Sequence, residues 1–307
     1  MNHVLTVAPN SWKKWVAALR PPTLLVGLSP VLIGLGFAWR SRLTGETPFA
    51  WSAAAAAVLL VIFLQSAANL VNDAKDAEKG IDQGPRLGPP RVVHSGWLSA
   101  RAVKRAYYLC FAAAGAIAAL LFWQAPDYLM LEVAAACGLA AYAYTAGPFP
   151  LAYYALGESV ALVFFGPVAV MGTSYLHTHR VDGSLAFWGV GSGCIAAAIM
   201  AINNARDRDG DARAGKHTLA TLSSEVGARR IPLVLLGVSA LFFTLYGQAH
   251  DALITGFILS GLAALYIARF LVPLLQAGPP MRLNLALKRT ALFNFLYALA
   301  FIYLIAM

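Results

Sequence analysis

Apolar residues recur along this chain in long runs that short polar loops separate. Nine runs approach or exceed the roughly 20 residues that an α-helix needs to cross a bilayer. They lie at about 22–39, 50–71, 103–123, 128–146, 156–176, 185–205, 231–247, 252–273 and 289–306. No stretch long enough for a separate soluble domain remains between them. The pattern predicts an all-α integral membrane protein of nine transmembrane helices, with residues 1–307 in one domain.

The composition agrees with this reading and excludes an ordinary soluble protein. Hydrophobic residues make up 59% of the chain and charged residues 12%, and the mean hydropathy is +0.65. The first apolar run follows Lys13 and Lys14, as a signal peptide would. It is too long for a signal sequence, however, and Arg40 and Arg42 follow it without a clear cleavage site. We therefore expect it to be retained as a membrane span.

The positive charges predict the orientation in the membrane. With the N-terminus inside, 20 of the 23 Lys and Arg residues fall on the inner side of the nine runs. Because cytoplasmic loops carry an excess of Lys and Arg, the N-terminus is expected in the cytoplasm. The formal net charge of +9 is mostly this topology signal. The basic residues are scattered over short loops, so no nucleic-acid partner is expected.

Two polar motifs follow two of the apolar runs on this inner side. The first motif, 69–82, reads NLVNDAKDAEKGID, and the second motif, 203–218, reads NNARDRDGDARAGKHT. Eight of the 14 acidic residues lie in or just after them: Asp73, Asp76, Glu78, Asp82, Asp207, Asp209, Asp211 and Glu225. So much negative charge at two matched sites of a membrane protein requires a counter-charge.

The two motifs also resemble each other. Residues 72–76 (NDAKD) align with residues 203–207 (NNARD) at an offset of 131 residues. Both motifs end helices that run from outside to inside, so the repeat is parallel. Spans 1–4 and 5–8 are then predicted to form two related halves of the domain, with span 9 added.

The spacing of the acids and amides suits a hard cation. Asn72 and Asp76 are four residues apart, as are Asn203 and Asp207, so each pair shares one helix face. The two members of a pair are then separated by about 6 Å along the helix axis. Mg²⁺ is typically bound by a few carboxylates, waters and substrate phosphate oxygens. The motifs also lie at helix C-termini, where the helix dipole disfavours carboxylates without cations. The pattern indicates an enzyme that binds Mg²⁺ together with a lipid diphosphate.

Basic residues near the motifs would complete a diphosphate site. Arg contacts phosphate with two parallel donors and Lys acts as a point charge, and together they would neutralise a leaving diphosphate. The alternative is that such residues only enforce topology. We favour a binding role for five of them: Lys75, Arg86, Arg91, Arg206 and Lys216. Glu158 begins the fifth run near the same level, where it would serve either as helix N-terminal charge or as part of a substrate pocket.

At these residues the chain resembles the UbiA-type intramembrane prenyltransferases, which have nine transmembrane helices and aspartate-rich motifs on the second and sixth. Within the family it is similar to the 1,4-dihydroxy-2-naphthoate polyprenyltransferases of menaquinone biosynthesis. The matching stretches are LRPPTL (19–24), the first motif, GPPRVVHSG (88–96), YTAGPFPLAYYALGE (144–158) and NNARDRDGDARAGKHTLAT (203–221).

The resemblance implies a reaction and a set of roles. Mg²⁺ binds the polyprenyl diphosphate, ionisation gives an allylic cation, and the dihydroxynaphthoate ring attacks it with loss of CO₂. The catalytic residues implied are Asp73, Asp76, Asp207, Asp211 and Lys216. Asn72 and Asn203 are implied as metal or phosphate partners. In the same stretches we expect Asp82 as a further metal ligand, and Asn69 and Tyr144 as substrate contacts.

Other readings stay open. The 4-hydroxybenzoate enzymes of ubiquinone synthesis, and the haem, chlorophyll and tocopherol branches, share both motifs. A cation-coupled transporter would also place acids in a membrane bundle, although transporter sites usually lie near the bilayer midplane. The expected partners are a polyprenyl diphosphate, dihydroxynaphthoate and the lipid bilayer. The expected location is a bacterial plasma membrane, with the active site facing the cytoplasm.

Overall fold

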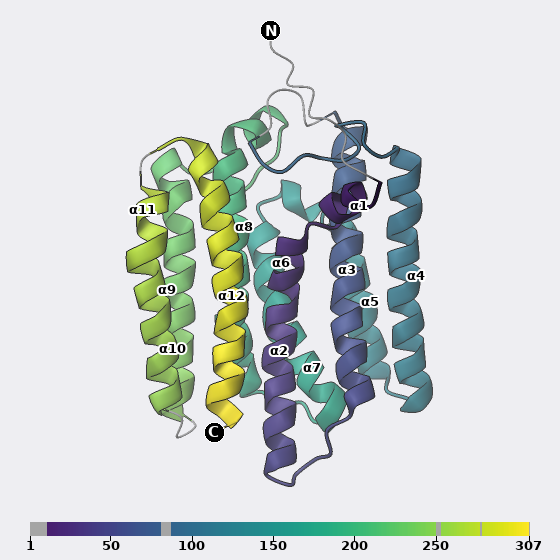
Figure 1. Cartoon of the computed structure of the whole chain (residues 1–307), viewed down its shortest axis with the longest axis vertical. Helices are drawn as coiled ribbons and strands as arrows, with labels where there is room; N and C mark the ends of the chain where they lie inside the picture. The colour runs from purple at the N-terminus through teal and green to yellow at the C-terminus, as the bar shows by residue number, and fades with distance from the viewer. Residues whose placement is uncertain (1–10, 81–86, 250–252, 277, 307) are drawn as a thin grey trace.

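The computed structural model describes residues 11–80, 87–249, 253–276 and 278–306, and their regular secondary structure is helical (Figure 1). The α-helices are α1 (Ser11–Leu19), α2 (Pro21–Leu43), α3 (Trp51–Glu78), α4 (Ala100–Gln124), α5 (Tyr128–Ala143), α6 (Gly157–Val163), α7 (Ala169–Thr178), α8 (Leu185–Arg213), α9 (Glu225–Ala249), α10 (Leu253–Tyr266), α11 (Val272–Leu275) and α12 (Leu283–Ala306). π-Helical turns join α6 to α7 (η2, Phe164–Val168) and α10 to α11 (η3, Ile267–Leu271). Two short 3₁₀ helices, η1 (Leu151–Tyr153) and η4 (Pro280–Arg282), complete the described elements.

Eight helical segments in the described part of the chain are long and apolar enough to cross a membrane. This confirms the all-α membrane class. They are Pro21–Leu43, Trp51–Glu78, Ala100–Gln124, Gly157–Thr178, Leu185–Arg213, Glu225–Leu245, Leu253–Leu275 and Pro280–Ala306. The remaining predicted run, the fourth (128–146), forms α5, which is apolar but has 16 residues. It ends early because Gly147 adopts a positive φ of 86° and Pro148 follows it, and neither residue favours a helix there.

The helices that carry the two motifs extend beyond their predicted ends. The apolar runs stop at 71 and 205, but α3 continues to Glu78 and α8 to Arg213. Ala, Asp, Asn, Lys and Arg tolerate helical backbone once the apolar face is anchored. Residues 69–78 of the first motif and 203–213 of the second therefore form the last turns of long helices, at the same end of the bundle as α1 (Figure 1).

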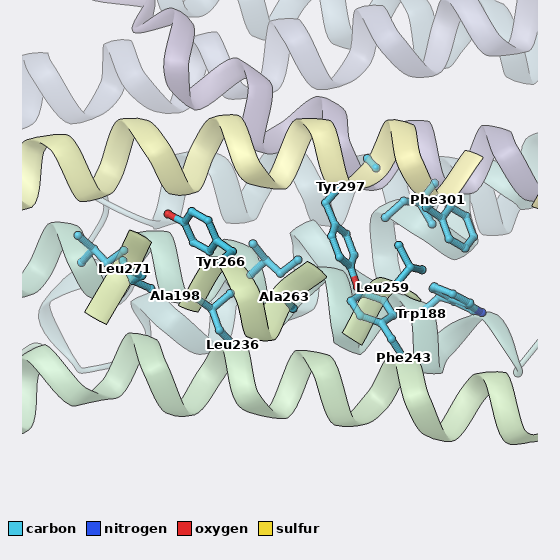
Figure 2. Close-up of a cluster of buried hydrophobic side chains, with 14 of the residues drawn as sticks. Trp188, Ala198, Leu236, Phe243, Leu259, Ala263, Tyr266, Leu271, Tyr297 and Phe301 are labelled. Atoms are coloured by element: carbon cyan, nitrogen blue, oxygen red, sulfur yellow. The ribbon is translucent and has the colours of Figure 1, made fainter. Parts of the chain in front are cut away.

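The largest buried cluster holds the C-terminal half together. Trp188 of α8, Phe243 of α9, and Tyr297 and Phe301 of α12 pack in tilted pairs with ring centroids 4.3–5.2 Å apart. Leu259 and Ala263 of α10 belong to the same cluster (Figure 2). α8 lies at the centre of the bundle, since 72% of its most apolar window is buried. Its position is well fixed because aromatic packing contributes beyond area burial alone.

Glycines bring the broken helix α6–η2–α7 close to α8. A Cβ on Gly166 would lie 2.5 Å from the carbonyl oxygen of Gly189, and one on Gly193 would lie 2.1 Å from that of Leu162. Small residues allow backbones to approach in this way within membranes. The π-turn at η2, which contains Pro167, bends the chain at the contact. The start of α6 is thereby held against the face of α8 that leads to the second motif.

Candidate active site

A cavity of about 1550 Å³ runs along the bundle. Its wall on α3 extends from Ser52 to Asp76, which at 1.5 Å per residue is about 36 Å. That length exceeds the roughly 30 Å hydrocarbon core of a bilayer. Asn, Asp, Arg and Lys side chains wall the end near α1, whereas Ala, Val, Leu and Phe dominate the rest. The cavity thus joins a charged head region to a long apolar tail region.

The first motif presents Asn72 and Asp76 to this cavity. Arg91, from the loop after α3, donates one guanidinium nitrogen to Asn72 Oδ1 and another to Asp76 Oδ2, the latter at 2.6 Å. Asn72 Nδ2 donates to Thr145 Oγ1 at 3.1 Å. Asp76 is 1% exposed and Arg91 7%. A buried pair of this kind is costly to break, because either partner alone would be an uncompensated charge.

Asp73 does not line the cavity. Its two carboxylate oxygens accept hydrogen bonds from the backbone N–H groups of Val92 and Val93, each at 3.0 Å. Charge-assisted bonds to backbone N–H groups are among the stronger hydrogen bonds of proteins. Asp73 therefore holds the loop that carries Arg91 against α3.

The start of α2 also reaches the first motif. Asn69 Nδ2 donates to the carbonyl oxygen of Leu19 at 3.0 Å and to Thr23 Oγ1 at 2.7 Å. Arg20, between α1 and α2, donates to Asn72 Oδ1 at 3.4 Å and lines the cavity. Its backbone is left-handed, with a φ of 51°, a costly conformation for a side chain with Cβ. The strained turn places one more cation at the charged end of the cavity.

The second motif is organised around Arg206, which is 3% exposed. Its Nε and one terminal nitrogen donate to the two carboxylate oxygens of Asp207, at 2.8 and 2.6 Å. It also donates to Asn203 Oδ1 at 2.8 Å and to Asn284 Oδ1, from η4–α12, at 2.9 Å. A Cβ on Gly88 would lie 2.8 Å from the guanidinium. Any larger residue at this position would require the Arg206 guanidinium to shift.

Lys216 links the two motifs. Its ammonium lies 3.7 Å from Asp76 Oδ1 and 3.5 Å from Asp211 Oδ1, and its side chain is 11% exposed. Its backbone N–H donates to the carbonyl oxygen of Asp211 at 2.9 Å, where α8 ends. The lysine therefore supplies counter-charge to a carboxylate from each half of the chain.

Two loops meet beside this lysine. Ala155 N–H donates to the His217 carbonyl oxygen at 2.6 Å, and His217 N–H donates to the Tyr153 carbonyl oxygen at 3.2 Å. The Tyr153 ring faces the ammonium groups of Lys79 and Lys216, at 4.1 and 5.3 Å from its centroid, a favourable cation–π arrangement. Desolvation by burial lowers the pKa of Lys79. The two loops thus border the cationic side of the charged end.

A second set of polar residues lies one turn deeper. Asn204 Nδ2 donates to Glu158 Oε1 at 2.9 Å, with exposures of 7% and 4%. The Tyr144 hydroxyl donates to Met200 Sδ at 3.1 Å, a weak acceptor. Asn204, Tyr144 and Met200 line the cavity, whereas Glu158 does not.

The structure brings most of the sequence-predicted site residues to one cavity wall. These are Asn69, Asn72, Asp76, Arg91, Tyr144, Asn203, Arg206, Asp207, Asp211 and Lys216. Three lie off the wall: Asp73 and Glu158, as described, and Lys75, whose ammonium pairs with Glu78 at 2.6 Å. Asp82 and Arg86 lie outside the described residues.

Sequence reasoning missed three side chains at this site. Arg20 and Asn204 both lie in stretches that match the family, so that match was the available signal. Asn284 had none. It bonds Arg206 across 78 residues of chain and donates to the carbonyl oxygen of Leu87 at 2.7 Å, a contact that only the tertiary fold creates.

The carboxylate oxygens at the charged end fit a hard cation that takes its other ligands from water and substrate phosphate. No three Asp, Glu, His or Cys side chains converge as a complete metal site in the described residues. Asp76, Asp207 and Asp211 nevertheless line one cavity, and Asp76 Oδ1 is buried without a hydrogen-bond donor. Mg²⁺ commonly takes one or two carboxylates and completes its shell with water and substrate phosphate. The residues present fit that mode of binding.

Known proteins are similar to this chain in sequence or in fold. A 1,4-dihydroxy-2-naphthoate octaprenyltransferase of Haemophilus influenzae is 35% identical over 243 residues, covering 77% of this chain and 78% of that protein. The enzyme of the same name from Escherichia coli is 33% identical over 237 residues, covering 76% and 75%. A UbiA homologue from Archaeoglobus fulgidus, solved with GPP and Mg²⁺, superimposes with a TM-score of 0.66 at 17% identity, covering 96% of this chain and 100% of that one.

The last similarity shows the fold alone, since its sequence identity is low. The family assignment rests on more of the sequence. The model of the UbiA prenyltransferase family matches residues 27–283, a range that contains both motifs, the loop with Arg91 and Lys216. The chain belongs to the UbiA prenyltransferase family.

Proposed function

We propose that this protein transfers a polyprenyl group from a polyprenyl diphosphate to 1,4-dihydroxy-2-naphthoate. CO₂ and diphosphate are released, and the product is demethylmenaquinone in its quinol form. The names of the relatives from H. influenzae and E. coli support this acceptor. The observation that carries the proposal is the cavity, which joins a cationic end to a long apolar wall, as a polyprenyl diphosphate requires.

The cations of the cavity wall are suited to hold the diphosphate. Arg20, Arg91, Arg206 and Lys216 all line the charged end. Each already neutralises a carboxylate or contacts an amide, so the diphosphate would enter a pre-organised array of donors. Such arrays are effective because they stabilise charge without reorganising during the reaction. They would take up the negative charge that develops on the diphosphate as the allylic C–O bond breaks.

Asp76, Asp207 and Asp211 would hold Mg²⁺ together with the diphosphate oxygens. When bound, the metal supplies Lewis-acid stabilisation of the leaving diphosphate. Asp73 and Glu158 act from behind the wall, Asp73 by fixing the Arg91 loop. The apolar remainder of the cavity would exclude water from the reacting carbon, so that the naphthoate ring rather than water attacks it.

We further propose nine membrane crossings, with the N-terminus and both motifs in the cytoplasm of a bacterial cell. α5 lines the same cavity as α3. α1 and the C-terminal end of α12 lie at opposite ends of the bundle (Figure 1), which requires an odd number of crossings and so supports α5 as a span. The motif end carries Lys216, Arg91 and most other cations, consistent with the positive-inside rule.

A prenyl-transfer assay tests the function. Purified protein with Mg²⁺ and a short polyprenyl diphosphate is offered dihydroxynaphthoate and 4-hydroxybenzoate in parallel. We expect product from the naphthoate alone, and no product after EDTA is added. Product from the benzoate alone would replace the acceptor but keep the class of enzyme. Product from neither would contradict the function, and undiminished turnover in EDTA would contradict the metal role.

A further inference from the structure

The pair formed by Asn204 and Glu158 has no task in the diphosphate site. Both side chains are more than nine-tenths buried. In the repeat, Asn204 occupies the position of Asp73, yet it faces the cavity where Asp73 does not. Burying a carboxylate and an amide together is costly unless they are well paired or meet a ligand.

Glu158 dictates which way the Asn204 amide points. Asn204 Nδ2 donates to Glu158 Oε1 at 2.9 Å, in keeping with the role of a carboxylate oxygen as a hydrogen-bond acceptor. The carbonyl oxygen of the amide then points the other way. Asn204 Oδ1 accepts no hydrogen bond from a described residue, and this oxygen is not fully enclosed by other atoms. It is therefore an accessible acceptor on the cavity wall.

Gly157 and Tyr144 line the cavity together with Asn204. A Cβ on Gly157 would lie 3.2 Å from the Tyr144 hydroxyl and 3.9 Å from Asn204 Nδ2, so Gly157 leaves the space between these two side chains open. Tyr144 bonds only a weak acceptor, Met200 Sδ. A planar ring bearing a hydroxyl would find an aromatic edge and a free carbonyl acceptor side by side.

We propose that Asn204 Oδ1 accepts a hydrogen bond from a ring hydroxyl of the aromatic acceptor, and that Glu158 is the positioning residue that fixes this orientation. The inference rests on the proposed function, because it names the acceptor side of the same site. A site built to hydrogen-bond a hydroxyl discriminates strongly against an analogue that lacks it, since the buried acceptor is then left unpaired.

Binding of naphthoates tests this without depending on turnover. The affinities of 1,4-dihydroxy-2-naphthoate, 1-hydroxy-2-naphthoate and 4-hydroxy-2-naphthoate are measured by equilibrium fluorescence titration. In the unaltered protein, at least one monohydroxy compound should bind about 10-fold more weakly than the dihydroxy compound. In Asn204→Leu this ratio should fall to about twofold, with geranyl diphosphate binding unchanged.

Glu158→Gln separates positioning from packing. It is isosteric, so it tests the proposal even if Asn204→Leu does not fold, and its amide no longer forces Asn204 to present Oδ1. The ratio should shrink in the same direction as in Asn204→Leu. Asn294→Leu, which removes a buried amide of α12 away from the cavity wall, is the matched control and should keep the ratio.

Three results would overturn the inference. One is no discrimination among the naphthoates in the unaltered protein, and another is a ratio that survives both substitutions. The third is an equal loss of geranyl diphosphate affinity in Asn204→Leu, which would assign Asn204 to the donor. Intact discrimination in a protein that transfers no prenyl group would instead count against the proposed function alone.

Discussion

The two motifs hold the same pair of side chains, but each takes its arginine from a different place. In the first motif, Arg91 arrives from the following loop and joins Asn72 to Asp76. In the second, Arg206 lies within the motif and joins Asn203 to Asp207. An amide and a carboxylate four residues apart thus meet one guanidinium in each half. The comparison teaches that the two motifs share a charge arrangement although the cation comes from a different position in the chain.

The two motifs also differ in how exposed their carboxylates are. The Asp76 side chain is 1% exposed, whereas that of Asp207 is 25% exposed. The second position of each motif differs too, since Asp73 fixes a loop through backbone N–H groups and Asn204 bonds α6 through Glu158. We infer that the first motif is the more rigid half of the charged end and the second the more accessible one.

The largest effects are expected from Asp76→Ala and Asp207→Ala. Each removes an oxygen donor for metal and diphosphate, so kcat/KM for prenyl transfer should fall by about 10²–10³-fold or more. Asp76→Ala should also lower the melting temperature in detergent more than Asp207→Ala, because it leaves Arg91 buried without its carboxylate, a cost of about 3–5 kcal/mol. Full activity in both variants would show that the assigned site is wrong.

Lysine substitutions probe the two arginines. Arg91→Lys and Arg206→Lys keep the charge but lose the planar set of donors, so each should lower kcat/KM about 10-fold or more. Arg206 also bonds Asn284 of the C-terminal segment, so Arg206→Lys should lose the more stability. Melting temperatures and kcat/KM measured side by side check this order. A larger stability loss for Arg91→Lys would contradict the stabilising role given to the contact between Arg206 and Asn284.

A smaller effect is expected from Asp73→Asn, which tests whether this residue acts through the loop. The amide leaves one backbone N–H without an acceptor, which should cost about 1–3 kcal/mol of stability. Proteolysis of the loop after α3 should speed up accordingly. Lys75→Gln is the matched control in the same motif and should change prenyl transfer by less than about twofold, because its partner is the half-exposed Glu78. If Asp73→Asn lowered kcat/KM for prenyl transfer as much as Asp76→Ala and left stability unchanged, Asp73 would be assigned to the metal instead.

The sequence by itself determined the class of fold and the place of the chemistry. Apolar runs close to or above the bilayer-spanning length leave helices as the practical choice, since every backbone polar group must be satisfied within the segment. The four-residue spacing of Asn72 and Asp76, and of Asn203 and Asp207, placed each pair on one helix face, and both pairs line the cavity. The parallel repeat stays a prediction. It is supported by the similar contacts of Arg91 and Arg206 with the amide and carboxylate of each motif.

Only the tertiary structure decided which polar residues face the cavity and which act from behind it. Asp73 and Asp76 are indistinguishable as acids in sequence, but Asp73 accepts backbone N–H groups of the loop after α3, whereas Asp76 lines the cavity and pairs with Arg91 and Lys216. The links from Arg206 to Asn284 and from Asn204 to Glu158 join residues 78 and 46 positions apart. Such contacts depend on how helices pack, and packing is set by many weak contacts over the whole bundle rather than by a local pattern.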